Sequence, residues 1–138
     1  MANKIGLKEK LKIFFTTHLG AWVAVVFVMG VIFYYSSLTQ PLHGDDLSLA
    51  TIVRKLGHLF EFGVLQLAIF NLYQRYKIRV SKSLVFSLSL TFLYSITDEL
   101  HQSFTFGRHA TYRDVVIDMA GALIAAWLIA LFVDKKQS

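Results

Sequence analysis

The uncharged stretch LGAWVAVVFVMGVIFYYSSL, residues 19–38, decides the fold of this chain. The hydrocarbon core of a bilayer is about 30 Å thick, and an α-helix needs roughly 20 mainly apolar residues to cross it. This stretch has that length and contains no acidic or basic side chain. The lysines before it resemble a signal peptide, but the long apolar run and the absence of a small-residue cleavage pattern after Tyr35 favour a retained transmembrane helix.

Three further stretches have a similar character, at residues 56–73, 84–98 and 115–133, and the last is interrupted only by Asp118. Each is apolar over most of a membrane thickness. The sequence therefore predicts a single domain over residues 1–138, an all-α integral membrane four-helix bundle. We expect its helices at about residues 13–38, 53–75, 82–104 and 113–134.

The composition supports a membrane protein, because 55% of the residues are hydrophobic and the mean hydropathy is +0.53. The net charge of +5 does not predict nucleic-acid binding, since the basic residues are confined to short segments between apolar stretches, where topology explains them. The chain has no cysteine, which excludes disulfides, thiolate metal sites and a cysteine nucleophile.

The basic residues also predict the orientation, because cytoplasmic loops carry an excess of Lys and Arg. Only Arg54, Lys55, Arg108 and Arg113 fall on one side of the predicted spans. We therefore expect a multi-pass protein of the cell membrane with both termini in the cytoplasm. The cytoplasmic set comprises Lys4, Lys8, Lys10, Lys12, Arg75, Lys77, Arg79, Lys82, Lys135 and Lys136.

Ionisable residues gather at the opposite, extracytoplasmic end. Arg54, His58 and Glu61 are spaced i, i+4 and i+7, so they share one helix face that descends about 10 Å from the surface. Because a charge at the centre of a membrane helix costs roughly 2.5–3.5 kcal/mol, this face should point into the protein. Other polar residues at the same end predict a pocket open to the outside: Asp98, Glu99, His101, Gln102, Arg108, His109, Arg113, Asp114 and Asp118.

Three motifs carry a resemblance to a known family. They are RKLGHLFEF at residues 54–62, TDELHQSF at residues 97–104, and Arg108 followed by the Arg113-Asp114-Val115 step. In order and spacing they resemble the VanZ-like membrane family over about residues 36–125. The resemblance implies a bacterial envelope protein that acts near surface precursors, and it links the family to resistance against the lipoglycopeptide teicoplanin.

Two positions depart from the family pattern as we expect it. Asp118 stands where that pattern more often has Asn, and His109 follows Arg108 where it has a smaller residue. Both departures add a titratable group near the predicted pocket.

We expect the pocket to bind an anionic envelope component, either a lipid head group or a cell-wall precursor, in contact with membrane lipids. Guanidinium groups bind phosphate and carboxylate through paired hydrogen bonds, and nearby carboxylates orient them. The predicted ligand-binding residues are Arg54, Asp98, Gln102, Arg108, Arg113, Asp114 and Asp118.

An alternative is a membrane enzyme that modifies or hydrolyses a lipid-linked envelope substrate by acid–base catalysis. Glu61 or Glu99 would be the general base, and His58 or His101 the acid or nucleophile. Two imidazoles and a carboxylate also form a catalytic zinc set, but the arginines favour an anion, so we predict neither a metal site nor a cofactor. Transport is favoured least, because the cytoplasmic halves of the spans carry no charge.

Structural roles compete with each of these hypotheses. His58 and Glu61 could simply join helices, and the polar block at residues 98–102 could be a solvated helix end. Lys55 could anchor a helix at the interface, and Asp114 could cap the last helix. Small residues predict close helix packing at four positions, Gly57, Gly63, Gly121 and Ala125.

Overall fold

The computed structural model describes residue 6 and residues 17–38, 49–106 and 111–137, and this part of the chain is helical apart from short turns. Its helices are α2 (His18–Ser36), α3 (Leu49–Arg75), α4 (Val80–Ser103) and α5 (Tyr112–Gln137). Each is long and apolar enough to cross a membrane. The predicted all-α fold with four membrane-spanning helices is therefore confirmed.

The helix ends follow local hydrogen-bonding rules. The Thr17 side chain accepts a 3.0 Å hydrogen bond from the backbone N–H of Gly20 and caps α2. Lys77 ends α3 with a positive φ of 55°. Its N–H donates to the carbonyl of Gln74, and that of Ile78 donates to Tyr73, which is the Schellman pattern of a helix stop. The compact turn lets α4 return directly alongside α3.

α3 begins at Leu49, one turn before the predicted residue 53. The sequence reasoning placed the start beside Arg54, where the charged residues mark the edge of the hydrocarbon, but a helix can extend past that edge. The added turn carries Leu49 and Ala50, which become part of a cavity wall described below. The predicted start of the first helix, at residue 13, lies outside the described residues.

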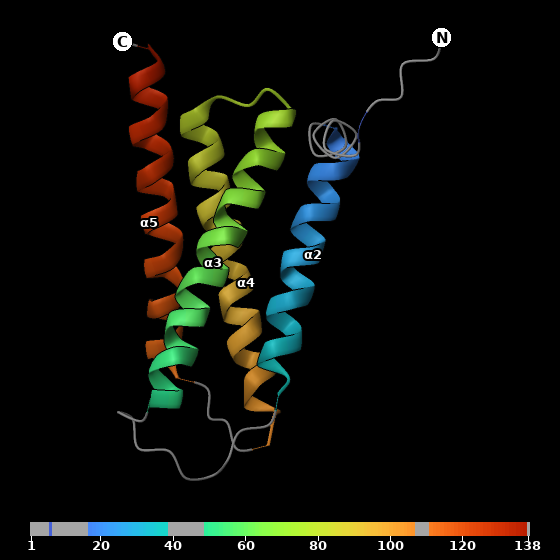
Figure 1. Ribbon diagram of the computed structural model, residues 1–138, viewed down its shortest axis with the longest axis vertical. Helices are drawn as coiled ribbons and strands as arrows, with labels where there is room; N and C mark the ends of the chain where they lie inside the picture. The colour runs from blue at the N-terminus through green and yellow to red at the C-terminus, as the bar shows by residue number, and fades with distance from the viewer. Residues whose placement is uncertain (1–5, 7–16, 39–48, 107–110, 138) are drawn as a thin grey trace.

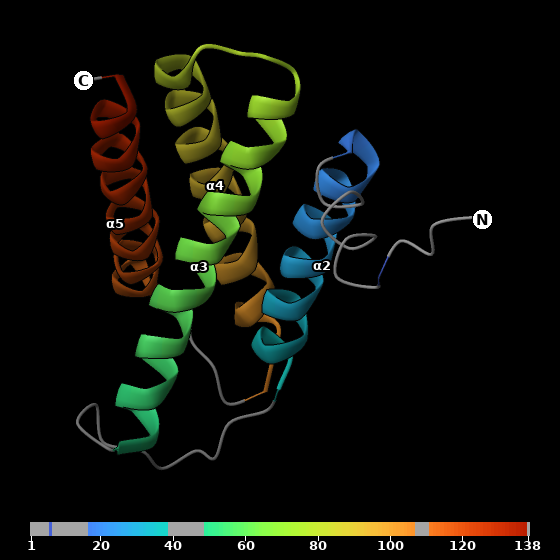
Figure 2. The same ribbon diagram turned by 45° about the horizontal axis from the view of Figure 1, so that its top comes forward.

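The four helices run antiparallel to their chain neighbours, and α3 packs against all three others. α2 and α5 flank α3 on opposite sides, while α4 lies behind it (Figure 1, Figure 2). The last turns of α2 and α4 and the first turns of α3 and α5 therefore meet at one end of the bundle. We call this the polar end; it is the lower end in Figure 1.

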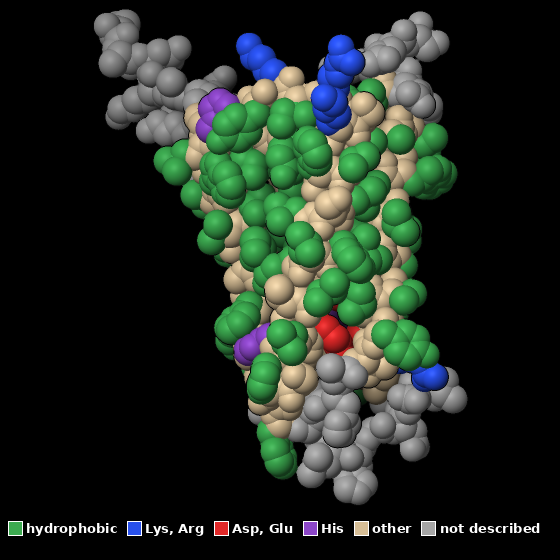
Figure 3. Space-filling model, turned by 180° about the vertical axis from the view of Figure 1, so that it is seen from behind, with side chains coloured by type: hydrophobic (Ala, Val, Ile, Leu, Met, Phe, Trp, Pro, Cys, Tyr) green, Lys and Arg blue, Asp and Glu red, His purple; other side chains and the backbone are tan. Residues whose placement is uncertain are grey.

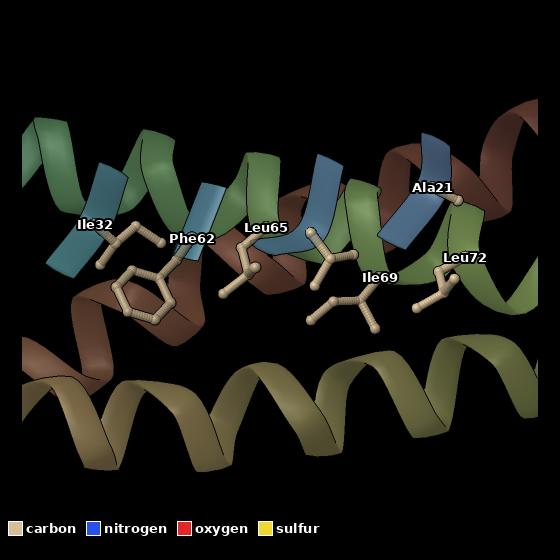
Figure 4. Close-up of a cluster of buried hydrophobic side chains, with 7 residues drawn as sticks. Ala21, Ile32, Phe62, Leu65, Ile69 and Leu72 are labelled. Carbon is tan, nitrogen blue, oxygen red and sulfur yellow. The ribbon is translucent and has the colours of Figure 1, made fainter. Parts of the chain in front are cut away.

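The hydrophobic core lies mainly between α2 and α3. Ala21, Val25 and Ile32 of α2 face a row of α3 side chains from Phe62 to Leu72 (Figure 4). By contrast, many large apolar residues point outward, and Phe27 and Phe132 are 68% and 72% exposed. Such an exterior suits a lipid environment, where apolar contacts replace water.

A polar seam on α4 packs within the bundle. Ser83, Ser87, Thr91 and Ser95 follow one another at i+4 spacing, and all four are fully buried. Gln66 of α3 joins the seam: its amide donates to Ser87 Oγ at 2.7 Å and accepts from Thr91 Oγ1 at 3.1 Å. The four hydroxyls have hydrogen-bond partners, so the seam fixes the register of α3 against α4 within the membrane.

α3 and α5 approach each other most closely at glycines. A Cβ atom on Gly121 would overlap the backbone carbonyl of Leu59, and one on Gly63 would lie 3.3 Å from the carbonyl oxygen of Gly121. The expectation of close packing is thus confirmed at these two positions. It is wrong for Gly57, where a Cβ would meet no atom within 4 Å.

We predict that Gly121→Ala lowers the free energy of unfolding by about 1–3 kcal/mol, because backbone atoms of α3 must move to admit the methyl group. This loss exceeds the gain of about 1 kcal/mol that alanine brings to a helix. Gly30→Ala is the matched control, since Gly30 faces open space on α2. Thermal unfolding in mild detergent would contradict the prediction if Gly121→Ala melted no lower than Gly30→Ala.

Candidate functional site

One face of α3 lines a large cavity at the polar end. Arg54, His58 and Glu61 border a cavity of about 830 Å³ between the end of α2 and the start of α3. These three residues share one helix face, as their spacing predicts, and all three line this cavity. Among the described residues, the rest of its lining is apolar or aromatic, from Tyr35, Leu38, Leu49, Ala50, Val53 and Gly57.

His58 also joins α3 to α5. Its Nδ1 lies 3.4 Å from Oδ1 of Asp118, and both side chains are buried. This distance suits an ion pair but is longer than a well-formed hydrogen bond, and neither atom has a hydrogen-bond partner among the described residues. Asp118 therefore faces the imidazole of His58 across the closest helix contact in the bundle.

Asp98 belongs to a different cluster, which joins α4 to α2. Its Oδ2 accepts a 2.8 Å hydrogen bond from Ser36 Oγ and a 2.7 Å bond from the amide of Gln102. Gln102 also donates to Ser36 Oγ at 3.3 Å, so the three side chains form a closed set, and all are at least 95% buried. We call this the α2–α4 knot.

His101 extends the same contact. Its Nε2 lies 2.9 Å from Ser37 Oγ, and its ring stacks on Phe33 with the ring centroids 4.2 Å apart. The predicted catalytic His101 therefore packs against α2 and is not among the residues that line the large cavity. Its catalytic role stays a prediction without support from this position.

Glu99 reaches the start of α5, where its Oε1 accepts a hydrogen bond from the backbone N–H of Thr111. Its Oε2 is buried and has no partner within the described ranges. Asp114 lies in the first turn of α5 rather than at the capping position before it. A carboxylate in this turn interacts favourably with the helix dipole.

The α3, α4 and α5 polar faces meet around a second, water-sized cavity of about 10 Å³. It is lined by Arg54, Lys55, His58, Gln102, Asp114 and Ile117. Arg54 and His58 of α3, Gln102 of α4 and Asp114 of α5 therefore border one small cavity.

Other predicted residues lie away from this point. Arg113 is exposed on the outside of α5. Arg108 and His109 lie outside the described residues. Figure 3 shows the protein from behind, with hydrophobic side chains over the middle, basic side chains near both ends, and acidic side chains in a recess near the lower end.

The described part of the chain shows no set of side chains arranged as metal ligands. No group of three or more His, Asp or Glu side chains there is placed to hold a metal ion. His58 and His101, the two imidazoles of the zinc alternative, face different helices, with Asp118 of α5 and Ser37 of α2 as their respective partners.

Sequence reasoning missed the α2 side of the site. Ser36 and Ser37 close an otherwise apolar span, and hydropathy treats two hydroxyls at a helix end as neutral. Their position could have indicated this role. Asp98 and His101 lie at the same depth on another helix, and no partner for either was evident in the sequence. Buried polar groups are usually paired, and Ser36 supplies a partner for the buried Asp98, whereas Ser37 contacts His101 at an exposed position.

Comparison with known proteins adds family membership. Residues 15–133 match the family model described as VanZ/LLP1. No curated protein and no solved structure matches the chain.

We predict that Ser36→Ala lowers the free energy of unfolding by roughly 0.6–1.7 kcal/mol, the range for interhelical hydrogen bonds in membranes, because Asp98 loses its partner on α2. Ser103→Ala is the matched control, since that exposed hydroxyl donates only to Leu100 in its own helix. Equal unfolding midpoints for the two variants in detergent would show that the α2–α4 knot does not hold α2 in place.

Proposed function

Since the chain belongs to the VanZ/LLP1 family, we propose that it is a cell-envelope membrane protein that binds an anionic envelope component at its polar end. The partner class is a lipid head group or a cell-wall precursor. The family resemblance extends the proposal to tolerance of teicoplanin, which acts on the same surface.

One observation carries this proposal: Arg54, His58 and Glu61 line a cavity of about 830 Å³ whose other described lining residues are apolar or aromatic. Binding sites of this size usually combine apolar walls with a few convergent polar groups. The guanidinium of Arg54 suits phosphate or carboxylate, because it offers paired donors and keeps its charge. Glu61 and His58 add an acceptor and a titratable ring for the rest of the ligand.

We also propose that the polar end faces outward and that both termini are cytoplasmic. Arg75, Lys77, Arg79 and Lys82 surround the α3–α4 turn at the other end of the bundle. Four basic residues in a short loop favour the cytoplasmic side. This orientation puts the cavity at the outer surface, where envelope precursors are exposed.

A second function, acid–base catalysis on a lipid-linked envelope substrate, is favoured by one specific observation. The carboxylate of Asp118 lies 3.4 Å from Nδ1 of His58, and His58 lines the cavity together with Glu61. A carboxylate beside one ring nitrogen favours one orientation and tautomer of an imidazole, which would suit His58 as the acid or nucleophile beside Glu61 as the general base.

The binding proposal predicts that Arg54→Gln weakens binding of an anionic phospholipid about tenfold or more. A hydrogen bond to a charged group contributes about 1.5–3 kcal/mol, and 1.4 kcal/mol corresponds to a factor of ten. Native mass spectrometry of the detergent-solubilised protein can measure this with an anionic phospholipid, a polyprenyl phosphate and a zwitterionic phospholipid.

The matched control for this experiment is Lys82→Gln, which removes the same charge from an exposed site at the other end of the bundle. The proposal is wrong if the protein shows no preference for anionic ligands, or if both variants weaken binding equally. In cells, Arg54→Gln should also reduce teicoplanin tolerance more than Lys82→Gln does.

Catalysis predicts a different result for Glu61→Gln. If Glu61 is the general base, the variant still binds the lipid substrate. It does not form the modified lipid that cells expressing the native protein contain. Mass spectrometry of envelope lipids from cells with the native protein, the variant and no protein measures that product. An identical lipid profile in all three cells would exclude the enzyme.

A further inference from the structure

The large cavity is amphipathic along its length. Arg54, His58 and Glu61 form a polar row on α3. Ala50, Val53 and Gly57 are spaced i, i+3 and i+7 on the same helix, so they form a second row beside the first. The two rows run side by side along the helix rather than end to end.

α2 supplies the wall that faces these rows. Tyr35 and Leu38, from the last turn of α2 and its end, border the cavity opposite α3. Much of the apolar lining is exposed: Leu38 is 45% exposed, Val53 60% and Leu49 76%. A water-soluble anion bound at Arg54 would leave this apolar surface unfilled.

Gly57 keeps the space open. A Cβ there would meet no atom within 4 Å, although the residue lies in the middle of a helix and borders the cavity. Glycine in a helix interior costs about 0.5–1 kcal/mol relative to alanine. Helix packing gives no reason for that cost at this position, whereas an occupant of the cavity does.

From these observations we propose that the occupant is a membrane lipid, with its phosphate beside Arg54 and a hydrocarbon chain that runs inward from there past Gly57. This inference rests on the proposed binding function and names its ligand class. The cavity volume lies within the roughly 300–1,000 Å³ of sites that enclose most of a ligand of drug size, far more than one phosphate fills.

The test compares ligands that share one head group and differ only in their chains. Native mass spectrometry of the full-length protein would use dioleoyl phosphatidylglycerol, dihexanoyl phosphatidylglycerol and glycerol phosphate. We expect the long-chain lipid to bind at least tenfold more tightly than the short-chain lipid. We expect glycerol phosphate to compete with neither.

The matched variants are Gly57→Leu and Gly30→Leu. Both replace a helical glycine that faces open space, but only Gly57 lines the cavity. We expect Gly57→Leu to weaken binding of the long-chain lipid at least tenfold and Gly30→Leu to leave it unchanged. If Gly57→Leu fails to give a monodisperse folded protein, Ala50→Trp in the exposed first turn of α3 fills the same cavity and decides the question.

Two outcomes would overturn the lipid inference and leave the proposed function standing. One is full competition by glycerol phosphate, which would indicate a soluble ligand. The other is unchanged lipid binding by the cavity-filling variant, which would place the chain elsewhere. If no anionic ligand binds and Arg54→Gln has no effect, the proposed function fails together with the inference.

Discussion

The pairing of buried polar groups in hydrocarbon is the constraint on which the rest of this structure depends. Asp98, which is 3% exposed, is stabilised in the bundle by hydrogen bonds from Ser36 and Gln102 to its Oδ2, while its Oδ1 has no partner among the described residues. That requirement draws the last turn of α2 toward α4. On the other side of the bundle, the His58–Asp118 pair and the contact of Gly121 with the Leu59 backbone draw α3 toward α5. α2 and α3 share a core in the middle but have different partners at the polar end, and the large cavity lies between them.

This arrangement divides the polar residues by role. Asp98, Gln102 and His101 make contacts with α2 that hold the bundle together, and Glu99 binds the backbone just before α5. Arg54, His58 and Glu61 border the space that these contacts create. The cavity has one wall from α2 and one from α3, so its shape depends on how these helices are held: α2 by its contacts with α4, and α3 in part by the pair of the lining residue His58 with Asp118 of α5. A change in the α2–α4 knot should therefore alter ligand binding without touching the ligand.

Much of the fold could be predicted from the sequence, because hydropathy over a membrane thickness and helical spacing are strong local signals. The spans, and the shared face of Arg54, His58 and Glu61, follow from such signals. The partners of each polar face cannot be predicted in this way, because the rotation of one helix against another depends on contacts between residues distant in the sequence. Gln66, Ser36 and Ser37 are neutral, and nothing in their own neighbourhood distinguishes a buried bridge from an exposed side chain. Likewise, Gly57 and Gly121 look alike in sequence, yet one borders a cavity and the other touches a backbone.

The proposed function requires the polar end to lie at the outer surface, and cysteine labelling in intact cells tests this orientation directly. The natural chain has no cysteine, so single substitutions report without background. Phe106→Cys places a thiol at the polar end, and Tyr76→Cys places one at the α3–α4 turn. The native side chains of Phe106 and Tyr76 are both exposed. A membrane-impermeant maleimide should label Phe106→Cys in intact cells and Tyr76→Cys only after the membrane is opened. The reverse pattern would place the cavity in the cytoplasm and contradict a role in binding outer envelope components.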